Sequence, residues 1–166
     1  MTKSMNRIEM LLQGWDYCYD EEGWSPPLKD ALNGVTAEQA NWRPAGEHVN
    51  TIWETLEHLI YYKERLLQRL TNQPDNSPAG DNDSTFAVQG SGEDGWQAAQ
   101  TRMREVHHAL REQIAAWTDA DYDRPIPKNL AGDWVSSLIQ HDAYHTGQII
   151  FLRKLQGSWP SRRSFG

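Results

Sequence analysis

His141 and His145 are four residues apart in a stretch that predicts a helix over 133–156. At that spacing two side chains lie one turn apart on the same face of a helix, where both imidazoles can reach one metal ion. Imidazole suits zinc, nickel, copper and iron, but two ligands rarely hold such an ion firmly. The pair therefore predicts a transition-metal site that takes a third ligand from elsewhere in the chain. Three neighbours share the face, which we expect to point inward: Leu138, Gln148 and Leu152.

Two other histidines compete for the third position. His58 lies on the apolar stripe of an earlier predicted helix. Both His58 and His141 lie about 12 Å from the start of their helices at 1.5 Å per residue, so packed helices can bring them together in either direction. His107 and the adjacent His108 point about 100° apart, so only one can face inward, and His107 falls on the apolar side. His48 precedes a helix and is expected to be exposed. The residue pattern alone leaves both His58 and His107 open.

Four segments show the apolar spacing of helices that pack on one another. They predict long helices over 5–20, 50–71, 93–117 and 133–156, with short extra helices between the first two. The polar connection over 72–92 has about twenty residues, a length that is uncommon and tends to be functional or mobile. It can cross a whole bundle, so the second and third helices need not be antiparallel. We therefore predict an all-α four-helix bundle with long connections, as a single domain over 1–166.

Capping residues predict where these helices begin and end. Thr51 and Glu54 fit a capping box at the start of the second long helix. Asp133 is the expected N-cap of the last helix, and Gly157 follows its end. We expect the connection from Asp119 to Gly132 to be a loop.

Composition excludes several classes of protein. The 166 residues carry a formal net charge of −7, which lacks the basic footprint that nucleic-acid binding needs. No apolar run is long enough to cross a membrane. Cys18 is the only cysteine, so no intrachain disulfide can form and a cytoplasmic location is expected. Eight tryptophans favour a well-filled helical core with an aromatic-lined mouth.

The segment from His141 to Ile149 reads His-Asp-Ala-Tyr-His-Thr-Gly-Gln-Ile. It resembles the H-x-x-x-H-x-G-Q-I signature of the DinB/YfiT-like superfamily. His58, in Trp-Glu-Thr-Leu-Glu-His, resembles the first ligand of that family, and the segment over 34–44 resembles its connector between helices one and two. The resemblance covers nearly the whole chain. It implies a four-helix bundle in which His58, His141 and His145 hold one divalent ion, with zinc or nickel the usual metals.

Three neutral imidazoles leave a tetrahedral ion one open position, which is typical of catalytic zinc. Such an ion can activate water, polarise a substrate oxygen or bind a thiolate. Helical geometry suggests four partners, none assigned a catalytic role: Glu54, Tyr62, Tyr144 and Gln148. Gln148 is favoured as a donor that orients a ligand, because ligating imidazoles usually need such a partner. The sequence shows no second conspicuous cluster of cysteine and histidine, which argues against a structural zinc site.

We expect a metal-dependent enzyme that acts on a small molecule. The resemblance implies either a hydrolase or a transferase of a low-molecular-weight thiol, active in stress or detoxification, and it favours a homodimer. The alternative is a non-enzymatic metal-binding or protein-interaction domain with a vestigial site. Neither reading involves nucleic acid or a membrane.

Overall fold

The computed structural model describes residues 4–46, 48–75 and 80–161. In those segments the chain is mostly helical, with one short hairpin. The first half contains α1 (Arg7–Tyr19), α2 (Leu28–Leu32), α3 (Ala37–Asn41) and α4 (Ile52–Leu70). The 3₁₀ helix η1 (Asp83–Phe86) precedes α5 (Gly92–Ala115) and α6 (Asp119–Tyr122). Strands β1 (Pro125–Ile126) and β2 (Asn129–Leu130) then lead into α7 (Ala131–Leu155).

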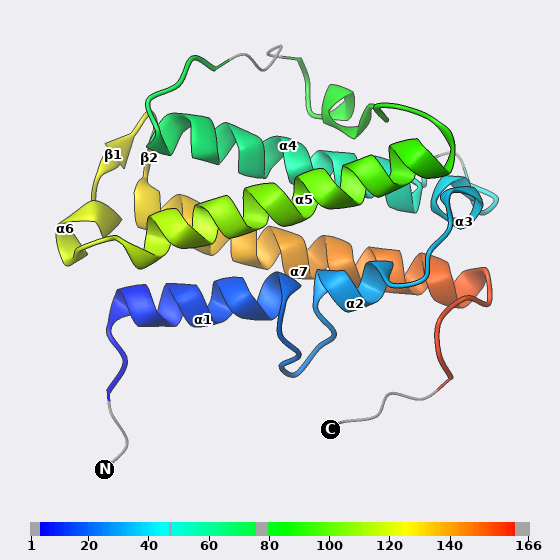
Figure 1. Ribbon diagram of the computed structural model, residues 1–166, viewed down its shortest axis with the longest axis horizontal. Coiled ribbons are helices and arrows are strands. Elements are labelled where there is room, and N and C mark those ends of the chain that lie inside the picture. The colour runs from blue at the N-terminus through cyan, green and yellow to red at the C-terminus, as the bar shows by residue number, and fades with distance from the viewer. Residues whose placement is uncertain (1–3, 47, 76–79, 162–166) are drawn as a thin grey trace.

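The long helices α1, α4, α5 and α7 lie side by side as a bundle (Figure 1). Helices α4 and α5 run in one direction, and α1 and α7 run in the other. In the described part of the connection between α4 and α5, η1 lies against α4 (Figure 1). The predicted four-helix bundle with a long crossover connection is therefore confirmed. No helix in the described ranges is long and apolar enough to cross a membrane.

Helix α4 shows how the local sequence sets the frame of the site. The Thr51 hydroxyl accepts from the Glu54 amide at 3.1 Å, and a Glu54 carboxylate oxygen accepts from the Thr51 amide at 2.7 Å. The predicted capping box is therefore present and fixes where α4 begins. The apolar stripe of α4 is buried, at Ile52, Leu56, Leu59, Leu66 and Leu70. His58 lies within this stripe, between Leu56 and Leu59, and is therefore buried in the bundle.

The core is rich in tryptophan, as the composition predicts. Trp15, Trp53 and Trp96 are completely buried. Each indole N–H has an acceptor: the carbonyl oxygen of His107 at 3.0 Å, Glu57 Oε1 at 3.2 Å and the carbonyl oxygen of Val35 at 2.6 Å, respectively. These bonds remove the penalty of burying an unpaired donor. Trp24, in contrast, is fully exposed.

The start of α7 differs from the prediction. The helix begins at Ala131 with Leu130 as its N-cap, so Asp133 lies in the first turn and the prediction of an Asp133 cap is wrong. The expected loop contains α6 and the β1–β2 hairpin, which delivers the chain into α7 with the Ala131 amide bonded to the Arg124 carbonyl at 2.9 Å. Asp133 can still favour the helix by its charge, because carboxylates near an N-terminus interact well with the helix dipole.

The inward face of α7 matches the expectation at Leu138 and Leu152, which are buried, and differs from it at Gln148. Gln148 and Tyr144 are exposed, whereas Asp142, Thr146 and Ile149 are buried. Polar residues occupy some inward positions of this helix, so apolar spacing alone misses part of its buried face.

Candidate metal centre

Three imidazoles from two helices converge inside the bundle. His58 comes from α4, and His141 and His145 come from successive turns of α7. Their candidate ligand nitrogens all lie within 4.8 Å of one another, and the Nε2 atoms of His58 and His141 are 2.9 Å apart. Ring centroids are 4.5 to 4.8 Å apart for each pair of rings. His58 and His145 are buried, and His141 is partly exposed.

The hydrogen bonds of Thr85 set the tautomer of His58. The Thr85 hydroxyl donates its one proton to the Asn82 carbonyl at 2.6 Å. It must therefore accept from His58 Nδ1, which lies 2.5 Å away. His58 then carries its proton on Nδ1 and presents the Nε2 lone pair to the other two rings. A partner that holds one ring nitrogen and frees the other is the usual arrangement around a metal-binding histidine.

Gln148 does the same for His145 from one turn further along α7. The Gln148 side-chain oxygen accepts from His145 Nδ1 at 2.7 Å, so the Nε2 lone pair of His145 is free. The contact was expected from spacing, but Gln148 acts as the acceptor and not as the donor. For His141, the Nδ1 atom is buried and has no hydrogen-bond partner among the described residues, while Nε2 faces His58.

Aromatic side chains enclose this cluster. The Phe86 ring stacks on His58 with centroids 4.0 Å apart and planes 8° apart. Tyr62 lies edge-on to His58 at 5.1 Å and to His141 at 5.4 Å. Thr85 and Phe86 both belong to η1, so the polar connection between α4 and α5 supplies one wall of the site.

Burial keeps all three imidazoles neutral. It lowers the pKa of His58 to about 3, with a smaller contribution from the neighbouring His141 and His145. Burial is also the main cause that lowers the pKa of His141 and of His145; the hydrogen bond to Gln148 partly offsets it in His145. Neutral imidazoles bind metal without first losing a proton, so the set is ready for a cation near neutral pH.

The other candidate partners have different roles. Glu54 completes the capping box and pairs with Arg43 at 2.6 Å. The Tyr62 hydroxyl donates to Asn82 Oδ1 at 3.1 Å, beside the histidine cluster. Tyr144 is 64% exposed, although its ring lies 4.9 Å from that of His145. Among these residues, Gln148 hydrogen-bonds His145 and Tyr62 packs against His58 and His141.

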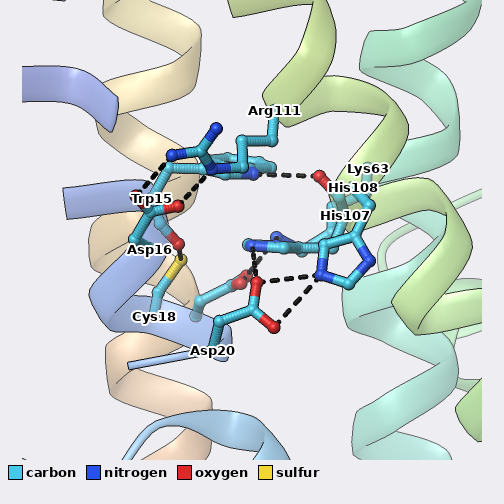
Figure 2. A network of polar contacts seen from close by, with 9 residues as sticks. Trp15, Asp16, Cys18, Asp20, Lys63, His107, His108 and Arg111 are labelled. Atoms are coloured by element: carbon cyan, nitrogen blue, oxygen red, sulfur yellow. Dashed lines mark hydrogen bonds and ion pairs between the residues drawn. The ribbon is translucent and has the colours of Figure 1, made fainter. Parts of the chain in front are cut away.

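His107 is buried in a separate cluster and does not compete with His58. Its ring stacks on Trp15 at 4.7 Å, and its Nδ1 atom accepts from the Lys63 ammonium at 3.2 Å (Figure 2). Burial and the Lys63 charge lower the pKa of His107 far below its usual range. The exposed His48 contributes nothing to either cluster.

The second cluster contradicts the expectation that no other group of cysteine and histidine exists. Ligand atoms of Cys18, His107 and Asp142 lie within 4.8 Å of one another, and all three residues are buried. The completely buried Lys63 ammonium lies 2.7 Å from Asp142 Oδ2 and 3.9 Å from the centre of the Trp15 ring. A cation is therefore already in place, and this donor set does not fit a metal ion.

The fold and the site together define a helical bundle that presents three neutral imidazoles from two antiparallel helices. The family model described as the DinB superfamily matches residues 27–149, which include all three histidines. The chain therefore belongs to the DinB superfamily. No curated protein and no solved structure matches it.

Proposed function

We propose that His58, His141 and His145 bind one divalent transition metal ion, zinc or nickel, in a site that acts on a small molecule. The observation that carries the proposal is the pair of anchored rings. Thr85 and Gln148 each accept from an Nδ1–H, so two lone pairs face the point where the third ring also converges. Nitrogen ligands and neutral charge fit such an ion.

A bound ion would supply Lewis acidity, which lowers the pKa of a coordinated water or thiol and polarises a substrate oxygen. The residues of the chain supply binding and orientation. Three protein ligands leave a tetrahedral ion one position for substrate. Phe86 and Tyr62 limit the access of water to His58, since their rings pack against it. The Tyr62 hydroxyl, which donates to Asn82, is a proton-carrying group of this wall.

Two reactions suit an open position of this kind. One is metal-assisted hydrolysis, and the other is transfer of a low-molecular-weight thiol to an electrophile in stress or detoxification. The alternative of a vestigial, non-enzymatic metal site predicts that no metal binds or that a bound ion keeps a closed coordination shell.

The test uses the cobalt-substituted protein, because its visible spectrum reports coordination number and ligand exchange. We expect one cobalt per chain in a site of low coordination number, and a saturable spectral change on titration with azide. A small thiol should add a sulfur-to-cobalt charge-transfer band if the transferase reading holds. The His108→Ala variant is the control, since His108 pairs with Asp20 away from the site. A spectrum insensitive to azide and thiols, or failure to bind cobalt, would overturn the proposal.

A further inference from the structure

A hollow of about 370 Å³ lies beside the candidate metal centre, between α4 and α7 and next to η1. One ligand, His141, forms part of its wall. The remaining wall residues are Tyr62, Asn82, Trp134, Ser137 and Leu138. Three other hollows of the described chain, next to Lys29, Lys128 and Phe151, have none of the three histidines in their walls. A molecule in the hollow beside His141 would therefore touch the metal centre.

The α7 side of this hollow follows one face of the helix. Trp134, Leu138 and His141 are four and three residues apart, so they lie one above another on successive turns. At 1.5 Å per residue, Trp134 and His141 are about 10 Å apart along the helix. A ring joined directly to a metal-binding group fits that span.

Aromatic rings and neutral polar groups make up the chemistry of the wall. Among the described residues, no carboxylate, ammonium or guanidinium group lines the hollow. Tyr62 and Trp134 offer ring surfaces, which add to the affinity for an aromatic group beyond area burial alone. The Asn82 side-chain oxygen accepts from the Tyr62 hydroxyl. The side-chain nitrogen of Asn82 is the group that can donate to a ligand.

The Trp134 indole is held in position from outside the hollow. The Arg69 guanidinium lies 5.5 Å from the centre of its ring and is itself paired with Asp75 at 3.2 Å. Leu138 beside it is buried. Binding of a flat group thus requires little reorganisation of this wall, which favours affinity.

We propose that this hollow binds a neutral aromatic group of the substrate while a polar atom of the same molecule reaches the ion. The inference rests on the proposed function, because it takes the metal at His141 as given. It adds a substrate class: small aromatic compounds that carry a metal-binding oxygen or sulfur close to the ring. Trp134 is then a specificity-determining residue.

Hydroxamates test this directly, since they bind metal through one head group and vary only in the attached part. Acetohydroxamate, benzohydroxamate and cyclohexanecarbohydroxamate are titrated into the cobalt-loaded full chain, and affinities are read from the visible spectrum. Burial of one phenyl ring should make benzohydroxamate about 10- to 100-fold tighter than acetohydroxamate. The cyclohexyl compound should bind several-fold more weakly than the phenyl compound, because it lacks the π face.

Three variants test whether the tighter binding of benzohydroxamate comes from this hollow. Trp134→Ala should lower benzohydroxamate affinity about 10-fold and leave acetohydroxamate within about twofold. Ser137→Tyr changes an exposed position and should fill the hollow, with the same selective loss, if Trp134→Ala fails to fold. Phe151→Ala is the matched control, because Phe151 lies on the same helix and lines the neighbouring hollow near Gln148.

The outcomes separate the two proposals. If the chain binds cobalt and all hydroxamates equally, the aromatic site is overturned and the metal centre stands. If the phenyl gain disappears with Phe151→Ala and survives Ser137→Tyr, the substrate lies in the other hollow and the inference is wrong. Equal affinity for the phenyl and cyclohexyl compounds would contradict the aromatic class. Failure to bind cobalt would overturn the proposed function and this inference with it.

Discussion

Replacement of Thr85 by valine tests whether the η1 segment prepares His58 for a metal ion. The change keeps the shape of the side chain and removes the buried oxygen that accepts from His58 Nδ1 at 2.5 Å. A buried donor left without an acceptor costs about 1–3 kcal/mol. In the metal-free variant His58 can move its proton or turn its ring, whereas the metal-bound ring cannot. The free-energy cost of the unpaired donor therefore arises mainly in the zinc-bound state, and we expect zinc affinity to drop about 10- to 100-fold.

Competition with a chromophoric chelator measures this affinity. Thr85→Ser keeps the hydroxyl and should restore most of the binding. Ser84→Ala is the matched control in the same 3₁₀ turn, because the Ser84 hydroxyl donates to the Asp81 carbonyl and does not contact His58. Its affinity should stay within about twofold of the unmodified protein. A folded Thr85→Val variant with unchanged zinc affinity, or an equal loss in Ser84→Ala, would refute the reasoning.

Three further predictions concern the partners of the buried histidines. Gln148→Ala should weaken zinc binding about 10-fold, and Gln148→Glu should recover it, because either an amide or a carboxylate oxygen can accept from His145 Nδ1. Zinc affinity is measured by chelator competition. Equal zinc affinity in the two variants would contradict a role of this hydrogen bond in orienting His145. Lys63→Met should lower the free energy of unfolding by about 3–5 kcal/mol, since it leaves the completely buried Asp142 carboxylate without its cation, and adding Asp142→Leu should recover much of it in urea titrations. If the double variant is no more stable than Lys63→Met alone, the loss of stability does not come from an unpaired Asp142 carboxylate, and the reasoning is wrong. Burial lowers the pKa of His58 to about 3 and that of His107 further, while the unfolded chain takes up these protons near pH 6.5. Stability of the metal-free protein is then greatest above pH 6.5 and falls as the pH drops towards the folded pKa values, by up to about 1.4 kcal/mol per pH unit for each such histidine. Urea titrations should give a shallower fall for His107→Gln, and a stability that does not change between pH 6.5 and 5 would contradict the assignment of neutral rings.

The sequence predicts the bundle and the meeting of the three rings for a simple reason. Helical spacing places His141 and His145 on one face, and His58 lies at a matching depth on a helix with a clear apolar stripe. The residue pattern alone leaves His107 as a competitor of His58 for the third position. The structure places it against Trp15 and Lys63, a contact between distant parts of the chain that spacing cannot reveal.

The remaining parts of the site depend on tertiary contacts. Thr85 and Phe86 lie in a polar connection, where no periodicity marks a residue as buried. Phe86 is a rare aromatic residue in that stretch, and this is the one signal in the sequence that could have pointed to it. The start of α7 differs from the one predicted from the sequence because a two-strand hairpin leads into it, and strands of two residues show no readable alternation of apolar and polar residues.

The most direct test of the central claim is the metal content of the purified full chain, measured by elemental mass spectrometry after loading with zinc and dialysis. We expect one zinc per chain in the unmodified protein and in His108→Ala, and strongly reduced zinc in His58→Ala, His141→Ala and His145→Ala, with all four variants folded. Full occupancy in the three site variants, or zinc lost from His108→Ala alone, would contradict the account.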